Sequence, residues 1–262
     1  MKNIFFLSGL PRSGSTLLGS LLSQNPDITV SPTSPLLDLL CSVNVAFDTL
    51  IQQYTFDVET VSKNVYSGLI ENFYKHINTD IIIDKHRGHP KNIKPLKMFV
   101  TDNPKIICTY RPIAEVITSY IVLIEKNKQE DNFVDNSLRK KNIPVNTTNR
   151  AQCLWEEYMS DSYKSMIDAL QNNRECLHII TYDELTNTPD IAINKIYDFL
   201  GLPYYTHKYS NIYNYCAEEK DEAWGLHNLH TIRTELKKIS TPPEQVLGSY
   251  LTDYYNQYNL VY

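Results

Sequence analysis

Apolar residues recur along the chain in two patterns, one typical of buried strands and one typical of helices. A short apolar run at residues 3–8 is closed by a cluster of Gly, Pro and Ser, which predicts a strand buried on both faces of a sheet. Leucines at helical spacing after Thr16 then predict a helix that ends at Asn25-Pro26. A strand, a glycine-containing loop and a helix therefore follow one another at the start of the chain.

The rest of the chain alternates in the same way. Short apolar runs predict three further strands, at residues 81–84, 105–110 and 177–182. Residues 34–78 have helical spacing, with Ser34 as the N-cap and Pro35 in the first turn. One apolar stripe on this stretch is predicted to belong to the core: Val58, Val61, Val65, Leu69, Phe73 and Ile77. Strands that alternate with helices predict a parallel sheet covered on both faces.

The chain shows no internal boundary between domains. No linker rich in Pro, Gly or Ser divides it, so we expect a single domain over residues 1–262, with a helical insertion at about 35–78. Residues 127–149 are polar and rich in Asn and Lys. This segment is predicted to be a surface loop or a mobile lid.

Charge and cysteine usage narrow the classes of protein that fit. The chain has 25 Lys and Arg residues against 30 Asp and Glu residues, so it lacks the basic surplus of nucleic-acid-binding proteins. No apolar run reaches the ~18 residues of a membrane span, and the first run is too short for a signal peptide, which predicts a cytoplasmic protein. Five widely spaced cysteines predict reduced thiols and no structural metal: Cys41, Cys108, Cys153, Cys176 and Cys216.

The loop after the first strand has the chemistry of a phosphate-binding loop. From Gly9 to Thr16 it fits the P-loop template at both glycines and at the final Thr, but Ser15 stands where a nucleotidase needs Lys. Backbone N–H groups and the helix dipole make such a loop an anion cradle, and Arg12 supplies the cation. This loop is best suited to a ligand whose terminal anionic group is smaller than a triphosphate. We therefore predict a P-loop NTPase-like, three-layer αβα fold with a central parallel sheet.

Several motifs of the chain, and their order along it, resemble those of PAPS-dependent sulfotransferases. Residues 11–18 resemble the family's loop for the 5′-phosphosulfate of the donor PAPS, and Arg111 followed by Ser119 resembles its element for the 3′-phosphate. The motif order as far as residues 224–230 is similar to bacterial sulfotransferases, nearer the tyrosylprotein and carbohydrate branch than the cytosolic small-molecule branch. The resemblance implies a donor site made of Pro11, Arg12, Ser13, Gly14, Ser15, Thr16, Leu17, Arg111, Ser119, Tyr182 and Arg233.

The resemblance also implies a reaction, the in-line transfer of a sulfuryl group from PAPS to a hydroxyl or amine without a metal, which leaves PAP. Arg12 and Lys85 are the implied catalytic cations, with Arg87 as a substitute for Lys85. The tyrosylprotein branch takes its base from a Glu where this chain has Pro32, Thr33 and Ser34. The cytosolic branch uses a His after the second strand, and counting back from Arg111 places His89 there. The alternatives for the base are His86, His227 and His230.

Two other interpretations of the chain stay open. In a P-loop kinase or NTPase, the strand at residues 81–84 would end in a Mg²⁺ ligand, Asp84, although Ser15 in place of Lys argues against this class. A non-catalytic nucleotide-binding protein would keep the fold without the chemistry. The acceptor is open as well, because the sequence does not distinguish among a small molecule, a carbohydrate and a peptide.

Overall fold

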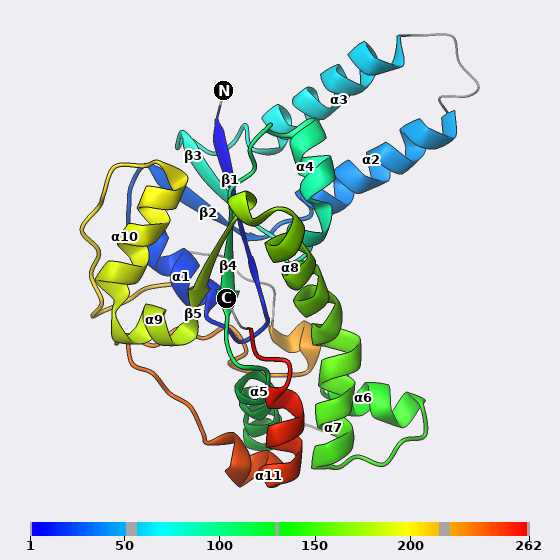
Figure 1. Cartoon of the computed structure of the whole chain (residues 1–262), viewed down its shortest axis with the longest axis vertical. Coiled ribbons are helices and arrows are strands. Elements are labelled where there is room, and N and C mark those ends of the chain that lie inside the picture. Colours follow the sequence, from blue (N-terminus) through cyan, green and yellow to red (C-terminus); the bar gives the residue numbers. More distant parts are fainter. Residues whose placement is uncertain (1, 51–56, 129–130, 215–220, 261–262) are drawn as a thin grey trace.

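Five parallel strands lie at the centre of the computed structural model, which describes residues 2–50, 57–128, 131–214 and 221–260 (Figure 1). Their order across the sheet is β2-β3-β1-β4-β5, and their bounds are β1 Asn3–Gly9, β2 Ile28–Thr33, β3 Ile81–Lys85, β4 Ile106–Tyr110 and β5 Leu177–Thr181. Four of these strands agree with the sequence prediction, and β2 was missed. Because β2 is an edge strand that carries Pro32 and shifts register after Val30, it lacks the apolar run of a central strand.

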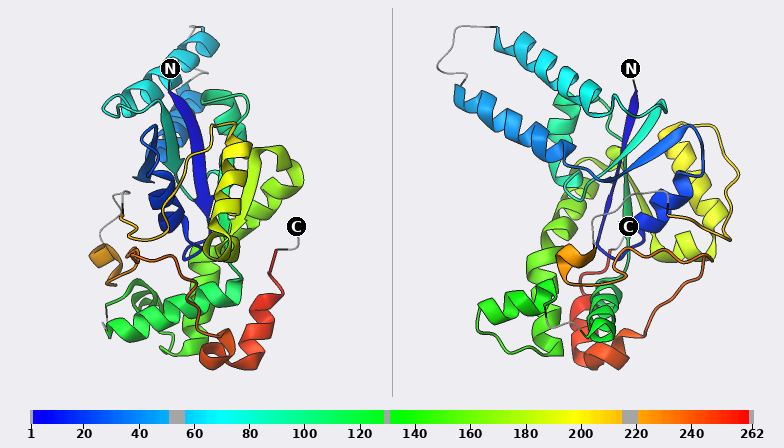
Figure 2. Two further views of the ribbon diagram at one scale, coloured as in Figure 1. Left: turned by 90° about the vertical axis from the view of Figure 1, so that its left-hand side faces the viewer. Right: turned by 180° about the vertical axis from the view of Figure 1, so that it is seen from behind.

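Alternate residues of the strands face opposite sides of the sheet, and helices cover both sides (Figures 1 and 2). In β1, Leu7 packs into the cluster on one face and Phe6 into the cluster on the other. The first face is covered by α1 (Ser15–Leu22), α9 (Tyr182–Asn187) and α10 (Pro189–Leu200), and the second by α5 (Ile113–Asn127) and α8 (Ser160–Asn172). The three-layer α/β fold with a central parallel sheet is therefore confirmed.

The helical stretch after β2 forms a pair of helices, α2 (Leu36–Leu50) and α3 (Val58–Phe73), that projects away from the sheet (Figures 1 and 2). The predicted cap at its start is present, because the N–H of Leu36 donates to Ser34 Oγ at 3.1 Å. At the start of α3, Asp57 plays the same part and accepts from the N–H of Thr60 at 3.1 Å.

The core stripe predicted on this stretch is only partly correct. Val61 and Val65 of α3 are 36% and 39% exposed, whereas Tyr66 is buried together with Leu36 and Leu40 of α2. A projecting pair of helices has the sheet at one end only, so its apolar residues are covered mainly by each other. The prediction of helical spacing is correct, but these side chains are less deeply buried than predicted.

The segment at residues 127–149 is not the loop that its polarity predicts. It contains α6 (Phe133–Lys140) and the first residues of α7 (Thr147–Cys153). Val134 and Leu138 are buried in the main hydrophobic cluster, while Lys140 is exposed. A short helix that buries one narrow face keeps a polar average composition, which explains the incorrect prediction. The role of this segment as a lid stays a prediction.

A largely buried ion pair between Asp135 and the partly exposed Arg150 ties α6 to α7, and its loss should destabilise the fold. Arg150 binds both carboxylate oxygens of Asp135 at 2.7 and 2.6 Å; burial opposes ionisation of Asp135, but hydrogen bonds from Arg150 and Asn132 lower its pKa. We expect Asp135→Ala to reduce the free energy of unfolding by about 2–3 kcal/mol in urea denaturation. The control Asp161→Ala removes only an exposed pair with Lys91 and should cost less than about 1 kcal/mol. Equal losses in the two variants would contradict the prediction.

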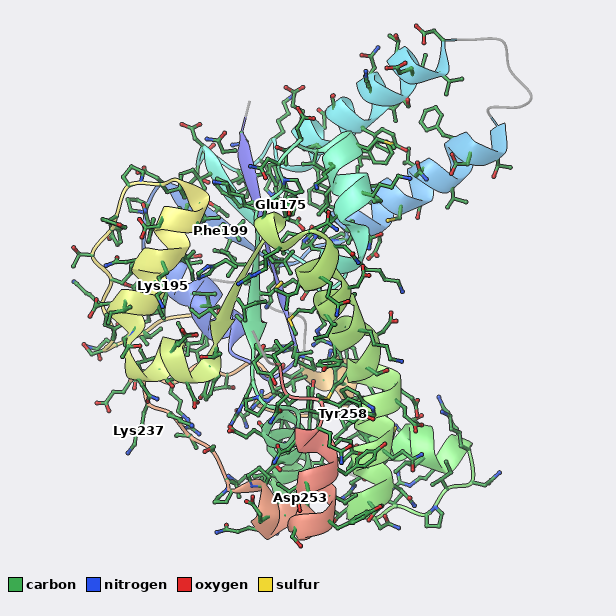
Figure 3. All side chains as sticks on the ribbon, in the orientation of Figure 1. Glu175, Lys195, Phe199, Lys237, Asp253 and Tyr258 are labelled. Atoms are coloured by element: carbon green, nitrogen blue, oxygen red, sulfur yellow. The ribbon has the colours of Figure 1, made fainter. Side chains whose placement is uncertain are left out.

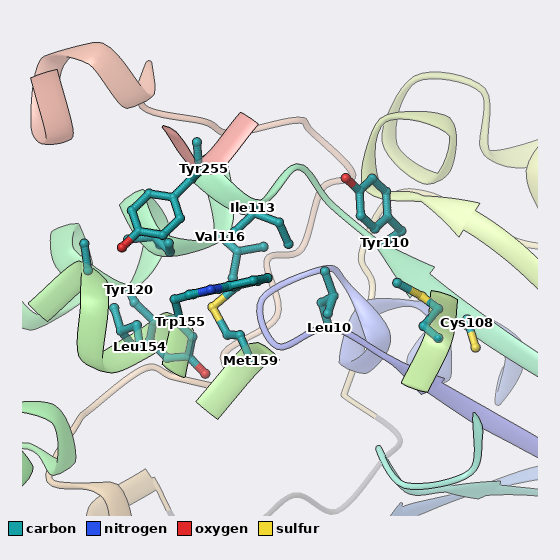
Figure 4. Close-up of a cluster of buried hydrophobic side chains, with 14 of the residues drawn as sticks. Leu10, Cys108, Tyr110, Ile113, Val116, Tyr120, Leu154, Trp155, Met159 and Tyr255 are labelled. Atoms are coloured by element: carbon teal, nitrogen blue, oxygen red, sulfur yellow. The ribbon is translucent and has the colours of Figure 1, made fainter. Parts of the chain in front are cut away.

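A π-helical segment, η2 (Leu154–Met159), joins α7 to α8 and connects the helical layer to the loop after β1. Trp155 and Met159 lie in one buried cluster with Leu10 of that loop (Figure 4). The remaining elements are η1 (Pro90–Asn92), α4 (Ile93–Phe99), η3 (Arg174–Cys176), η4 (Asp221–Trp224) and α11 (Pro243–Asn256), which packs against α5 (Figure 1).

Two sequence predictions concern membrane-spanning segments and the state of the cysteines. None of the described helices is long and apolar enough to cross a membrane. The four described cysteines are free thiols, namely Cys41, Cys108, Cys153 and Cys176, and Cys216 lies outside the described residues.

Candidate active site at the carboxyl edge of the sheet

A cavity of about 810 Å³ opens at the edge of the sheet where the strands end. Its lining includes Gly9 at the end of β1, Lys85 at the end of β3 and Arg111 directly after β4. Because the strands are all parallel, their carboxyl ends meet at this edge, which is where α/β proteins bind ligands. The fold thus gathers three sequence-predicted regions into one site.

The loop between β1 and α1 has a shape that requires glycine at two positions. A Cβ atom on Gly9 (φ 137°) would lie 2.3 Å from the carbonyl oxygen of Thr109, and Gly14 (φ 97°) is the N-cap of α1. Ser13 is buried outside the cavity lining, where its hydroxyl donates to the carbonyl oxygen of Leu10 and lies 2.6 Å from Thr109 Oγ1. Its side chain thus fixes the loop, and the cavity is lined by Pro11, Arg12, Gly14, Ser15, Thr16 and Leu17.

Arg12 joins this loop to two other parts of the site. Its Nε donates to Ser119 Oγ of α5 at 3.3 Å, and its Nη1 donates to the carbonyl oxygen of Leu229. Burial lowers the pKa of Arg12, while Tyr120 and Asp221 oppose that lowering. Since a guanidinium stays protonated in proteins, Arg12 is a fixed positive charge in the cavity wall.

Lys85 places a second positive charge beside the start of α1. Its Nζ donates to Thr16 Oγ1 at 3.3 Å, and its backbone N–H donates to Ser31 Oγ at 2.8 Å. Only 9% of Lys85 is exposed, so its charge acts on a bound anion with less screening than a surface lysine would. Arg87, two residues further on, also lines the cavity.

Arg111 is buried and held by three contacts. Its Nε donates to Glu115 Oε2 at 3.0 Å, its Nη2 donates to the carbonyl oxygen of Ile239 at 3.4 Å, and its guanidinium lies 4.5 Å above the centre of the Tyr182 ring. These contacts fix the plane of the guanidinium and leave further N–H donors on it. Ser119, predicted to act with Arg111, lines the same cavity but contacts Arg12.

The extended chain at residues 226–241, which we call the C-terminal segment, forms another wall of the cavity. Arg233 and Lys237 line it, and Lys237 lies on the stretch that leads toward α11 (Figure 3). Lys238 anchors the segment to α9 through Asp183, with 2.8 Å between Nζ and Oδ1. The predicted basic residue of this region, Arg233, is therefore at the cavity.

The cavity has the opposite charge balance to the whole chain, whose net charge is −5. Its lining carries two acidic residues, Glu115 and Glu235. Against these stand seven basic residues: Arg12, Lys85, Arg87, Arg111, Lys126, Arg233 and Lys237. Such a concentration of positive charge in an acidic protein favours an anionic ligand.

Of the four histidines that the sequence offers as the catalytic base, the structure places three at the cavity and one away from it. His89 is 1% exposed and does not line the cavity, because its Nε2 lies 2.9 Å from Asp84 Oδ1 on the far side of β3. The same alternation along β3 that turns Lys85 into the cavity turns Asp84 away from it. The structure therefore does not bring the expected base, or the Mg²⁺ ligand of a kinase, to the cavity. The histidines that line it are His86, His227 and His230.

An aromatic wall, which the sequence did not predict, lines the cavity beside Tyr120 of α5. Phe133 packs edge-on against Tyr158 and Trp224, with ring centres 4.6 and 5.5 Å apart. The three residues come from α6, the π-helical segment and η4, and all line the cavity. No shared motif links them in the sequence, because only folding brings them together.

Comparison with known proteins agrees with this geometry. A family model described as the sulfotransferase domain matches residues 2–244. The sulfotransferase domain from the curacin biosynthetic pathway is similar in structure, with a TM-score of 0.52 and 18% identity over 100% of this chain and 93% of that one. A mouse sulfotransferase complexed with PAP has a TM-score of 0.48 and 18% identity over 79% of this chain and 61% of that one.

A sulfotransferase from Alicyclobacillus acidocaldarius has a TM-score of 0.48 and 17% identity over 79% of this chain and 84% of that one. No curated protein matches the sequence. At 18% identity the likeness to the curacin-pathway domain shows the fold, whereas the family model spans nearly the whole chain, including the loop and Arg111. On that match the chain belongs to the sulfotransferase family, whose chemistry is sulfuryl transfer.

Proposed function

We propose that this protein transfers a sulfuryl group from PAPS to a hydroxyl or amine acceptor without a resident metal. The observation that carries the proposal is the basic cavity around an anion-binding loop in which Ser15 replaces the lysine of nucleotidases. When bound, PAPS supplies the sulfuryl group and departs as PAP. The residues of the chain must bind its two anionic ends, orient it and stabilise the charge that develops during transfer.

The cavity residues fit a ligand that is anionic at two ends. The first turn of α1 has N–H groups without helical partners, and Gly14 to Leu17 line the cavity there, so this end suits the 5′-phosphosulfate. Arg111, Ser119 and Arg233 suit the 3′-phosphate, since Glu115 already fixes the guanidinium plane of Arg111. Tyr182 offers an aromatic face for the adenine.

Arg12 and Lys85 are placed to stabilise the transfer itself. Both lie at the N-terminal end of α1, one in the loop and one against Thr16. Fixed cations in a partly dry cavity stabilise developing negative charge without reorganising, and the lower charge of a sulfuryl group removes the need for a metal that phosphoryl transfer has.

The acceptor is proposed to bind at the aromatic wall. Helix α5 runs along the cavity, and Tyr120, the residue after Ser119, lies against Phe133 of the wall, with ring centres 5.9 Å apart. The wall of Phe133, Tyr158 and Trp224 therefore lies beside the part of α5 that faces the donor loop. Its flat apolar faces suit a small molecule with a ring, a carbohydrate or a peptide side chain.

The donor site can be tested before any acceptor is known. We expect calorimetric titration with PAP to give micromolar affinity, about −8 kcal/mol, and to give the same value with and without Mg²⁺. Titration with ATP under both conditions is the matched comparison. Mg²⁺-dependent ATP binding without a response to PAP would reject the proposal and favour a kinase.

A further inference from the structure

We propose that His230, oriented by Asp221, is the catalytic base that removes the acceptor proton. This inference rests on the proposed sulfuryl transfer and assigns a residue to its one unassigned role. The base would then come from the C-terminal segment and not from the chain after β3, where sequence counting places it.

Asp221 fixes both the ring and the backbone of His230. Its Oδ1 lies 2.8 Å from His230 Nδ1, and its Oδ2 accepts hydrogen bonds from the N–H of Leu229 at 2.7 Å and of His230 at 3.4 Å. A carboxylate on Nδ1 selects the tautomer with the proton on that nitrogen and leaves the lone pair on Nε2. Among the residues that the structure describes, none occupies Nε2 of His230.

The pair lies next to the proposed catalytic loop. The carbonyl oxygen of Leu229, directly before His230, accepts a hydrogen bond from Arg12 Nη1. His230 itself lines the cavity, together with the donor loop and the aromatic wall. His230 thus shares one cavity with the residues that suit the donor and with those that suit the acceptor.

The other two histidines at the cavity lie in different surroundings. In His86, Nδ1 accepts from the N–H of Gly88 at 3.0 Å and Nε2 lies 3.4 Å from Asp38 Oδ2, so both ring nitrogens are engaged. His227 is exposed, and the bonds that join it to Asn127 are made by its main chain. His230 combines an orienting carboxylate with a second ring nitrogen that contacts no described residue.

The step balances without a further reactant. The acceptor O–H proton moves to Nε2 of His230, the acceptor oxygen forms the new bond to sulfur, and the bond between sulfur and the bridging phosphate oxygen breaks with its electron pair leaving on PAP. The imidazolium then returns the proton to solvent. Asp221 stabilises the imidazolium through Nδ1 and is a positioning residue in this scheme.

The substitution Asp221→Asn changes the contact to the His230 ring while keeping the hydrogen bonds to the backbone. The amide oxygen of Asn can still accept from the two backbone N–H groups, but its NH₂ group would donate to Nδ1 and force the proton onto Nε2. We expect ¹⁵N NMR of histidine-labelled protein to show the Nδ1–H tautomer for His230 in the wild type and the Nε2–H tautomer in Asp221→Asn, with His230→Asn identifying the signal. A wild-type Nε2–H tautomer would overturn the proposal, whatever the donor is.

Turnover provides the second readout. With PAPS as donor and either water or phenol as acceptor, we expect His230→Asn and Asp221→Asn to lower kcat by about 10²–10⁴-fold, with the affinity for PAP unchanged within about threefold. His76→Asn, an exposed histidine outside the cavity, is the matched control and should keep wild-type kcat.

The outcomes distinguish this inference from the function on which it rests. An unchanged kcat in His230→Asn, or a wild type that binds PAP but transfers to neither acceptor, would overturn the assignment of the base. A wild type that does not bind PAP would reject the proposed function, and the NMR experiment would still decide whether Asp221 sets the tautomer of His230.

Discussion

Lys85→Ala is expected to lower kcat for sulfuryl transfer by about 10²–10³-fold. Lys85 is 9% exposed and reaches Thr16 at the start of α1, so the substitution removes a desolvated charge where the transferred group would lie. Initial rates of PAP formation from PAPS measure the effect. Because the N–H groups of α1 that we propose to bind phosphate remain, we expect the affinity for PAP to change much less than kcat.

The control for Lys85 is another lysine whose charge lies outside the cavity. Lys94 of α4 is exposed and absent from the cavity lining, so Lys94→Ala should keep wild-type kcat. Lys85→Arg retains a cation but changes its length and geometry, and it should recover only part of the rate. Wild-type turnover in Lys85→Ala would remove this residue from the mechanism.

Arg111→Ala is expected to weaken PAP binding by about 10- to 100-fold, the loss of one or two charge-assisted hydrogen bonds. The guanidinium is fixed by Glu115 and by the face of Tyr182, so its remaining donors are oriented before the ligand binds. The substitution also leaves the partly buried Glu115 unpaired, which adds a negative charge to an anion site. Calorimetry with PAP measures the effect directly.

Two variants make the Arg111 experiment specific. Arg111→Lys keeps the charge but loses the planar fork and the stacking on Tyr182, so its affinity should fall between wild type and Arg111→Ala. Arg139→Ala removes an exposed arginine of α6 outside the cavity and should bind PAP as the wild type does. Equal PAP affinity in all of these proteins would place the 3′-phosphate elsewhere.

Local sequence predicted four of the five strands and failed at β2. The runs that became β1, β3, β4 and β5 are apolar because helices cover both faces of the sheet. β2 is an edge strand that also carries Ser31 and Pro32 and shifts register after Val30, so its apolar pattern is lost, whereas β5 at the other edge keeps an apolar run. A similar failure affected α6, whose buried face is too narrow to raise the apolar content of residues 127–149.

The loop between β1 and α1 is the part of the candidate site whose shape the sequence predicted best. Gly9 and Gly14 permit backbone conformations that other residues rarely adopt, and Arg12 and Thr16 lie within the same few residues. The loop's shape is thus a local property. Counting along the chain does not bring His89 to the cavity, because the chain after β3 turns this residue onto Asp84, which strand alternation points away from the cavity.

By itself the sequence determined what short-range forces control: the strand, the anion-binding loop and the helix that follows it, and the alternation of helices and strands. Only the tertiary structure decided which distant side chains meet. Arg12 reaches Ser119 across 107 positions, and His230, held by Asp221, lines the cavity because the C-terminal segment folds back over the loop. Such contacts depend on how whole layers of the fold pack. This packing is set by a free-energy balance over many residues, which a local sequence pattern does not contain.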